Sequence, residues 1–243
     1  MKSQTRDFQR GHNLKQIFFV RHGQASFGKE SYDNLSDLGI LQSKKLNEYF
    51  KKEGLIFDLC ITGNLLRHRQ TKDHSIEGML TETVEIIETD FLNEFPESLW
   101  KKIAHDISLE DKNFAILLTR VMQQDKKTRL FFKIAERIIL EWVGGRTPVG
   151  EESYKSFRER TLRFPGLLTE KIRRAKLGIV FSSGTPISIL LSHYAGIPED
   201  RELNWLTYIW NTSLSVLQIR NDKAFFSQIN SIPHLSKKER SLI

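Results

Sequence analysis

Three residues that could take part in a chemical reaction directly follow an apolar run. Ile17–Val20 (IFFV) is followed at once by Arg21, His22 and Gly23. A neutral imidazole nitrogen can attack phosphorus, a guanidinium group can neutralise phosphoryl oxygens, and glycine lets the backbone approach a ligand closely. In an open α/β sheet, ligands bind beyond the carboxyl ends of the strands, which is where these residues would lie. The alternative is a chance tripeptide at a strand end, satisfied by local hydrogen bonds.

A second cationic segment follows the next apolar run. Leu59–Thr62 leads into Gly63–Thr71, which reads GNLLRHRQT. If this run is also a strand, Arg67 lies at the same edge of the sheet as His22 and can reach the same anion. The N-terminus of the helix that follows would then supply backbone donors. Taken alone, the segment favours Arg67 and Arg69 as solvent-facing charges of a helix.

A third motif, LNEF at Leu92–Phe95, makes the set specific. Together the three segments closely resemble the motifs of the histidine phosphatase superfamily, whose fold is shared with the cofactor-dependent phosphoglycerate mutases. The resemblance covers most of the chain except a helical insertion. It also includes YDNLSDLG, GEES and NTS, at Tyr32–Gly39, Gly150–Ser153 and Asn211–Ser213.

The resemblance implies roles for four side chains. His22 would be phosphorylated transiently, Arg21 and Arg67 would hold the phosphate, and Glu94 would protonate the leaving oxygen. These four residues are the expected catalytic set.

Glu94 also has a basis in its own surroundings. It follows an expected strand and stands between Asn93 and Phe95. A carboxyl partly shielded by apolar neighbours has a raised pKa and can donate a proton. The nearby carboxyls that compete for this role are Glu88, Asp90 and Glu97.

One position departs from the family pattern. The family usually carries a second histidine after an apolar strand, where this chain has IVFSSGTPI and Ser183 takes the histidine's place. A serine donates one hydrogen bond but carries no positive charge. The loss of one charge-assisted contact costs about 1.5–3 kcal/mol of transition-state stabilisation, which slows turnover rather than abolishing it. The amides of the helix that begins near Pro186 can compensate in part. Alternatively, Ser182 and Ser183 only cap that helix.

The expected substrate-binding residues are Gly23, Gln24, Ser183 and Gly184. His68 stands where the family more commonly has a small residue. Two interpretations stay open: a surface histidine, which is favoured, or an imidazole that replaces the missing one from another direction.

Short apolar runs alternate with longer helical segments, which predicts an α/β fold. We expect a three-layer sandwich with a mostly parallel central sheet and helices on both faces. The expected strands are Ile17–Val20, Leu59–Thr62, Val84–Thr89, Gly178–Ser182, Ser213–Arg220 and Ala224–Ile229, the last two forming a hairpin around Asn221–Lys223.

Helical periodicity dominates a long middle segment. From Ser98 to Trp142 apolar residues recur every three or four positions, which predicts an inserted helical cap, residues 98–142, within one domain, residues 1–243. Further helices are expected over Ser36–Lys52, from about Glu151 with a kink or split at Pro165–Gly166, and from near Pro186 to Gly196.

Composition excludes several classes of protein. Hydrophobic residues make up 39% and charged residues 28% of the 243 residues, as in ordinary globular proteins, and no apolar run is long enough to span a bilayer. The net charge of +7 favours anionic partners. However, the excess is scattered in pairs such as Lys44–Lys45, which are usual on solvated helix faces. A nucleic-acid function would rest on net charge alone, and neither nucleic acid nor membrane is an expected partner.

Cysteine and histidine usage indicates no metal. Cys60 is the one cysteine, which excludes an internal disulfide and a cysteine-built zinc site. Metal-ligand spacing is absent among His12, His74, His105, His193 and His234. No metal or cofactor is therefore expected. The N-terminal segment lacks the apolar core of a secretory signal, so we expect a cytoplasmic protein. Its oligomeric state stays open.

The expected function is hydrolysis of a small phosphomonoester through phospho-His22, and the expected partner is a small phosphorylated substrate or inorganic phosphate. A mutase is less expected, because the phosphoglycerate mutases resemble RHGESxxN after the first strand and this chain reads RHGQASFG. The alternative is a catalytically weakened member that binds a phosphorylated ligand or protein in a regulatory role. The reason for this alternative is that Ser183 replaces the family's second histidine.

Overall fold

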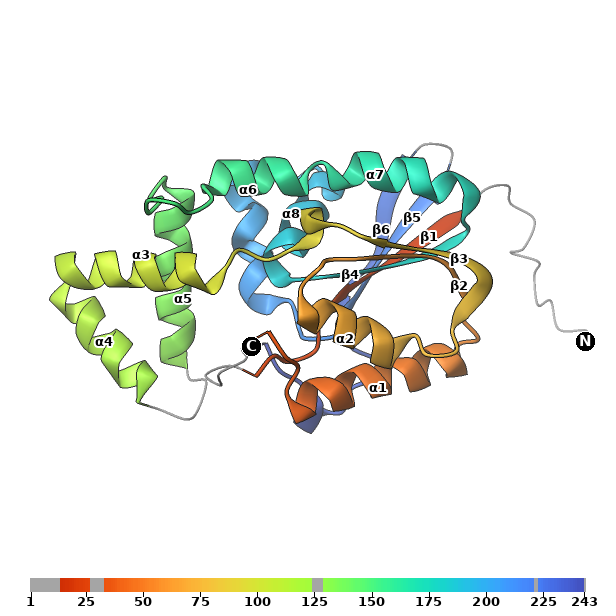
Figure 1. Cartoon of the computed structure of the whole chain (residues 1–243), viewed down its shortest axis with the longest axis horizontal. Coiled ribbons are helices and arrows are strands. Elements are labelled where there is room, and N and C mark those ends of the chain that lie inside the picture. Colours follow the sequence, from red (N-terminus) through yellow and green to blue (C-terminus); the bar gives the residue numbers. More distant parts are fainter. Residues whose placement is uncertain (1–13, 27–32, 124–128, 221–222, 243) are drawn as a thin grey trace, which may run out of the picture.

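The computed structural model describes residues 14–26, 33–123, 129–220 and 223–242. Its centre is a six-stranded sheet in the order β3-β2-β4-β1-β5-β6 (Figure 1). Strands β1 to β4 are mutually parallel, while β5 is antiparallel to both β1 and β6, so the sheet is mostly parallel, as predicted. The strands are β1 Lys15–Arg21, β2 Phe57–Thr62, β3 Leu80–Glu88, β4 Leu177–Ser182, β5 Leu214–Arg220 and β6 Lys223–Ser231.

Helices cover both faces of the sheet. Successive side chains of β1 point to opposite faces, so Phe18 and Val20 pack with Leu46 and Phe50 of α1, whereas Ile17 and Phe19 pack under α7 and α8. These two apolar clusters fill the space between the sheet and the helices on each face, so the fold is the three-layer sandwich that the sequence predicts. The helices are α1 Asp37–Lys52, α2 Leu66–Ser75, α6 Tyr154–Thr161, α7 Phe164–Lys171 and α8 Gly184–Ala195.

The helix ends follow their capping residues. The Ser36 side chain accepts a hydrogen bond from the Gly39 amide at 3.1 Å and begins α1 where predicted. At the end of α8, Gly196 adopts φ +67°, the left-handed conformation that glycine tolerates. The expected start of α8 near Pro186 is two residues late, because Ser183 is already the extended cap residue and Gly184 the first helical one.

The inserted segment forms three helices with a core of their own. They are α3 Glu97–Glu110, α4 Lys112–Met122 and α5 Arg129–Val143, grouped beyond one end of the sheet in Figure 1. Their buried side chains are those that the periodicity selects, among them Leu99, Ile103, Phe114, Ile138 and Trp142. The predicted helical periodicity is thus confirmed over the described residues of this segment, while its role as a cap stays a prediction.

Two other expectations need correction. The split between α6 and α7 falls at Leu162 and Arg163, because Pro165 occupies the first turn of α7, where its missing amide hydrogen costs nothing. The sequence also did not predict the short 3-10 helices η1 Asp90–Leu92, η2 Ile172–Arg174, η3 Glu199–Tyr208 and η4 Lys237–Glu239. The predicted turn of the β5–β6 hairpin, at Asn221 and Asp222, lies outside the described residues, but the two strands pair antiparallel as expected.

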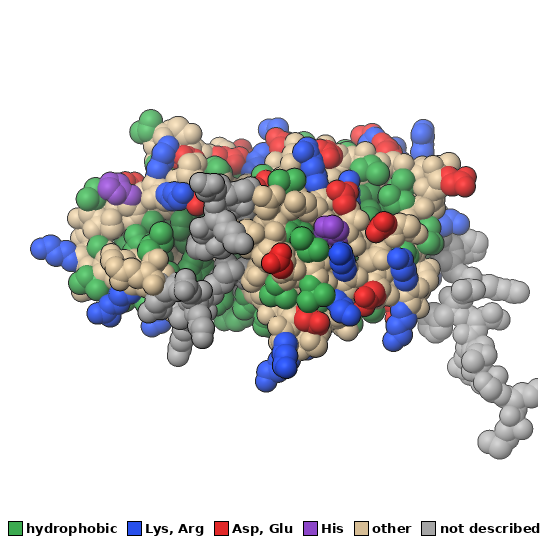
Figure 2. All heavy atoms as spheres, turned by 60° about the horizontal axis from the view of Figure 1, so that its bottom comes forward, with side chains coloured by type: hydrophobic (Ala, Val, Ile, Leu, Met, Phe, Trp, Pro, Cys, Tyr) green, Lys and Arg blue, Asp and Glu red, His purple; other side chains and the backbone are tan. Residues whose placement is uncertain are grey.

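The surface carries its charge in mixed form. On the face in Figure 2, basic and acidic side chains are interspersed over the sheet domain and do not gather into one basic patch. Over the part of the chain that the structure describes, we find no helix that combines the length and apolar character needed to cross a bilayer.

Candidate active site

The strand order brings three chain segments to one edge of the sheet. Strand β4 lies between β1 and β2, so the residues that follow these strands are neighbours. Arg21 pairs with Ser182, and Thr62 with Phe181, at matching carboxyl ends. His22 extends this pairing, because its amide donates to the Ser182 carbonyl at 2.9 Å. The segments around His22, Arg67 and Ser183 therefore meet, as the first two were predicted to do.

His22 is buried and has a defined hydrogen bond. Its side chain is 7% exposed, and its Nδ1 lies 2.7 Å from the Gly23 carbonyl oxygen. A carbonyl can only accept, so Nδ1 carries the proton and Nε2 keeps its lone pair. Burial, with the nearby Arg67 and Arg21 guanidinium groups and His68, holds the pKa of His22 well below its ordinary 6.5. At neutral pH the site thus presents an uncharged imidazole with a free nitrogen lone pair.

The backbone of His22 is held by the residues just before β5. Asn211 donates from Nδ2 to the His22 carbonyl at 3.1 Å, and the Thr212 amide donates to the Arg21 carbonyl at 2.9 Å. Thr212 adopts φ +56°, which is unusual for a residue other than glycine and marks a tightly determined corner. Asn211 is held in turn by Ser241, whose hydroxyl donates to its Oδ1 at 2.8 Å. The sequence motif NTS contains this corner, but no role was predicted for it.

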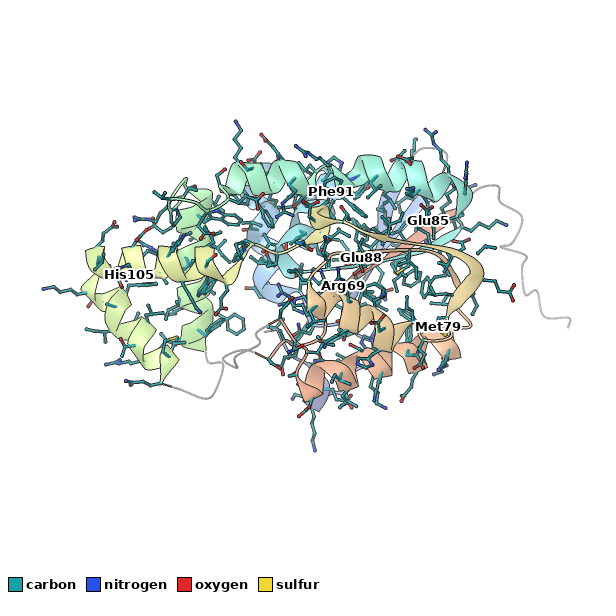
Figure 3. All side chains as sticks on the ribbon, viewed as in Figure 1. Arg69, Met79, Glu85, Glu88, Phe91 and His105 are labelled. Atoms are coloured by element: carbon teal, nitrogen blue, oxygen red, sulfur yellow. The ribbon has the colours of Figure 1, made fainter. Side chains whose placement is uncertain are left out.

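Arg67 is a buried cation, and Arg69 is not. Arg67 is 5% exposed and donates from Nη1 to Asp33 Oδ1 at 2.7 Å, while the Leu66 amide donates to Asp33 Oδ2 at 2.6 Å. Asp33 therefore binds both the side chain of Arg67 and the first backbone amide of α2, which holds the guanidinium group in place. Arg69 instead pairs with Glu88 of β3 on the exposed side, 2.5 Å away (Figure 3). The solvent-facing interpretation is correct for Arg69 and wrong for Arg67.

Arg21 reaches toward the first residue of α8. Its Nη1 donates to the Ile209 carbonyl, and to the Leu242 carbonyl at 2.7 Å. A Cβ atom on Gly184 would lie 3.7 Å from Arg21 Nε, so the guanidinium group packs against the start of that helix. The predicted phosphate-binding residues Arg21 and Gly184 are therefore neighbours.

Glu94 lies at the N-terminus of α8. Its Oε2 accepts from the Thr185 amide at 3.1 Å, and its Oε1 accepts from the Phe95 amide at 3.2 Å. Two of the competing carboxyls form ion pairs elsewhere, Glu88 with Arg69 and Glu97 with Lys101. Glu94 is the carboxyl that the fold brings to the edge occupied by Ser183 and Gly184.

Gly23 and Gln24 link the first loop to two helices. The Gly23 amide donates to Thr71 Oγ1 of α2 at 2.9 Å, and a Cβ atom at Gly23 would lie 2.6 Å from the Gly39 carbonyl oxygen. Only glycine fits this approach to α1. The Gln24 amide donates to Gln42 Oε1, and its own Oε1 accepts from the Ser36 hydroxyl, each at 2.9 Å. These contacts hold the loop in place.

Ser183 is the N-cap residue of α8 by position, but its side chain contacts His68. Its Oγ lies 2.7 Å from His68 Nε2, both residues are fully buried, and the Ser183 side chain makes no capping hydrogen bond. The His68 ring centre lies 5.6 Å from that of His22. Burial, and secondarily Arg67, lowers the pKa of His68 well below 6.5. Ser183 therefore does not only cap the helix, and the surface interpretation of His68 is wrong.

The donor set fits an anion better than a metal. Among residues 14–26, 33–123, 129–220 and 223–242, no group of three or more histidine, cysteine, aspartate or glutamate side chains is arranged to hold a metal ion. The side chains that act on His22 most closely are cationic or neutral, namely Arg67, Arg21 and His68, and His68 in turn contacts Ser183. Such an arrangement can bind a phosphoryl group and present a nitrogen nucleophile to it.

Comparison with known proteins agrees with this geometry. Residues 121–232, just under half of the chain, match the model of the Histidine phosphatase superfamily (branch 1). The matched segment contains Ser183 and Asn211 and begins after His22 and Arg67. A 2,3-bisphosphoglycerate-dependent phosphoglycerate mutase of Treponema denticola is 24% identical over 255 residues, covering 92% of this chain and 99% of that relative.

Solved structures share the fold at low sequence identity. The α-ribazole phosphatase of Shigella flexneri superimposes with a TM-score of 0.62 at 18% identity, covering 89% of this chain and 96% of that one. A mycobacterial glucosyl-3-phosphoglycerate phosphatase in complex with inorganic phosphate gives 0.60 at 16% identity, covering 91% and 100%. Residues 121–232 thus resemble the histidine phosphatase superfamily, and the whole fold is similar to that of the solved phosphatases.

Proposed function

We propose that the chain is a phosphomonoester hydrolase that acts through a phosphohistidine intermediate at His22. The observation that carries the proposal is the state of His22. The imidazole is neutral, its Nδ1 proton is engaged by the Gly23 carbonyl, and guanidinium groups of Arg21 and Arg67 lie nearby. The substrate is a small phosphorylated molecule, with inorganic phosphate as product, and we expect the enzyme to be cytoplasmic.

In the first step, His22 Nε2 attacks phosphorus and the bond from phosphorus to the ester oxygen breaks. Glu94 gives its proton to the departing oxygen and becomes a carboxylate. Arg21 and Arg67 stabilise charge on the phosphoryl oxygens, and each charge-assisted hydrogen bond contributes about 1.5–3 kcal/mol. Gly23, Gln24, Ser183 and Gly184 are proposed to contact the same phosphoryl group.

In the second step, water attacks the phosphorus of phospho-His22. The Glu94 carboxylate takes a proton from that water, the nitrogen–phosphorus bond breaks, and phosphate leaves with His22 again neutral. The carboxyl therefore acts as acid and then as base, and the cycle restores every proton.

The helical insertion, residues 98–142 in the sequence prediction, is proposed to cap the site and select the substrate. Phe95 supports this role, because it follows Glu94 directly and packs on Trp142 of α5 with ring centres 4.9 Å apart. The insertion thus packs against the residue that follows the proposed acid.

Hydrolysis of a generic aryl phosphate by the wild type and by His22→Ala tests this proposal. We expect turnover by the wild type and a decrease of at least about a thousandfold in the variant, because the nucleophile is gone. His105→Ala, an exposed histidine on α3, is the control and should keep full activity. Phosphate binding without turnover by the wild type would contradict the hydrolase and favour the catalytically weakened, regulatory binder.

A phosphoglycerate mutase is the second candidate. It is favoured by the Treponema denticola relative, which this chain matches along nearly its whole length. The discriminating assay incubates the protein with a phosphoglycerate and 2,3-bisphosphoglycerate. If the phosphoglycerate is isomerised faster than phosphate is released, the protein is a mutase. His22 would then still be the nucleophile, but it would transfer the phosphoryl group to another substrate and not to water.

A further inference from the structure

Two buried polar side chains next to His22 contact each other. His68 comes from the first turn of α2 and Ser183 from the residue before α8, so the contact joins the segments after β2 and β4. Both are fully buried, and His68 Nε2 lies 2.7 Å from Ser183 Oγ. A buried polar pair of this kind persists only when its hydrogen bonds are satisfied, so the direction of the proton in this contact matters.

The other nitrogen of His68 fixes that direction. Its Nδ1 is buried and, within the described part of the chain, makes no hydrogen bond of good geometry, although the nearby Gly63 backbone favours protonation of the ring and raises the His68 pKa against the effect of burial. It packs against Gly63, where an added Cβ would lie 2.2 Å away. An orphaned buried N–H group is rarer and more costly than an orphaned lone pair. Ser183 Oγ, 2.7 Å from Nε2, is the better-placed acceptor, so we assign the proton to Nε2, which then donates to Ser183 Oγ.

This arrangement leaves the Ser183 hydroxyl hydrogen available as a donor. Ser183 makes no capping bond to α8, and its oxygen already accepts from His68. A hydroxyl that accepts one hydrogen bond becomes a stronger donor in the next, since chains of hydrogen bonds polarise one another.

The position of Ser183 directs this donor to the site. Arg21 and Ser182 are register partners on adjacent parallel strands, so His22 and Ser183 are the next residues of those strands, side by side. The centre of the His68 ring lies 5.6 Å from that of the His22 ring. A phosphoryl group bound at His22 is thus next to the hydroxyl.

We propose that His68 is a positioning residue that acts through Ser183: the two form a relay that donates one hydrogen bond to a phosphoryl oxygen bound at His22. This inference rests on the proposed function. The relay is an uncharged arm that complements the guanidinium groups of Arg21 and Arg67.

A double-mutant cycle tests the relay. The dissociation constants of orthovanadate and inorganic phosphate are measured for the wild type, Ser183→Ala, His68→Leu and the double variant, together with kcat and KM for an aryl phosphate. We expect each single variant to weaken vanadate binding about tenfold, which is about 1.4 kcal/mol. The double variant should be no weaker than the worse single one, because both remove the same donor.

Conservative and control variants separate the relay from a packing role. His68→Gln keeps an N–H group near the Nε2 position, so it should bind vanadate within about threefold of the wild type. His74→Ala removes another histidine from α2 and should leave vanadate binding unchanged. Additive effects in the cycle, or loss of binding in His68→Gln equal to that in His68→Leu, would overturn the relay.

A measurement on the wild type tests the relay even if the variants fail to fold. Nitrogen NMR of the imidazoles reports which nitrogen of His68 bears hydrogen, and we expect Nε2–H with and without phosphate. An Nδ1–H tautomer would overturn the relay. If the two substitutions have coupled effects on vanadate binding but the protein hydrolyses no phosphate ester, the relay is supported and the phosphatase function is contradicted. If the protein hydrolyses the ester but the two effects are additive, the phosphatase function is supported and the relay is contradicted. A wild type that binds neither anion would overturn both.

Discussion

A histidine that accepts a phosphoryl group must keep a lone pair at neutral pH, and the surroundings of His22 provide this. Burial and two guanidinium groups make its protonation unfavourable, while the Gly23 carbonyl keeps hydrogen on Nδ1. The same cations attract the phosphoryl group. One electrostatic arrangement therefore prepares the nucleophile and binds its target.

The buried histidines predict how stability depends on pH. The pKa values of His22 and His68 are well below 6.5, and burial lowers the pKa of His234 to about 4. In the unfolded chain these side chains take up protons near pH 6.5, but in the folded chain they do not. Their stabilising effect is therefore complete above pH 6.5 and is lost as the pH falls from there toward the folded pKa values.

Urea unfolding at several pH values measures this loss. We expect the free energy of unfolding to decrease below pH 6.5 by up to about 1.4 kcal/mol per pH unit for each histidine. His234→Gln should have a shallower slope than the wild type over this range. A stability that stays constant down to about pH 5, or an unchanged slope in His234→Gln, would show that these histidines are not held neutral.

At the scale of elements, the site follows from strand order. Because β4 separates β1 from β2, three loops that are distant in the sequence converge on His22. The convergence is tight at Gly63, directly after β2. A Cβ atom there would lie 2.2 Å from His68 Nδ1 and 2.8 Å from Asn93 Oδ1.

Gly63→Ala should therefore damage both stability and anion binding. We expect a loss of about 1–3 kcal/mol in the free energy of unfolding, because the methyl group overpacks a buried site. Phosphate binding should weaken as well, since His68 must move. Gly166→Ala on the exposed side of α7 is the matched control, with nothing within 4 Å of the added Cβ. It should be neutral or stabilise by up to about 1 kcal/mol. Equal behaviour of the two variants would contradict the packing described for His68.

The sequence predicts the parts of this site that follow apolar strands. Short continuous apolar runs indicate β1, β2 and β4, and the polar and charged residues after them then lie at one edge. The sequence could not predict that His68 is buried, because the buried residues of α2 are all polar: Arg67, His68, Thr71 and Ser75. Hydrophobic periodicity does not detect such a face. Asp33 and Asn211 lie in motifs that carry the resemblance, but their roles could not be predicted because these roles are hydrogen bonds to distant segments.

For the whole molecule, the principal question is how the insertion is joined to the sheet domain. Trp142 of α5 is a central contact. It is buried, packs on Phe95, Tyr154 and Phe157, and donates from Nε1 to the Glu152 carbonyl at 3.0 Å. It thus ties the helices of the insertion to α6 and to the residue after Glu94.

Trp142→Ala should destabilise the protein by about 3–5 kcal/mol, because it leaves a large cavity in the shared core. Leu109→Ala, at a side chain that is 74% exposed on α3, should change stability by less than about 0.5 kcal/mol. Chemical denaturation of both variants checks this difference. A small effect of Trp142→Ala would mean that the insertion is only loosely joined to the rest of the chain.

Trapping the intermediate tests the central claim most directly. The protein is incubated with a phosphate donor that carries a radioactive phosphoryl group, quenched in base, which preserves phosphohistidine, and digested so that the labelled residue can be mapped. We predict label on His22 in the wild type, and none in His22→Ala. Label on another residue, or hydrolysis of the donor without any labelled histidine, would contradict the account.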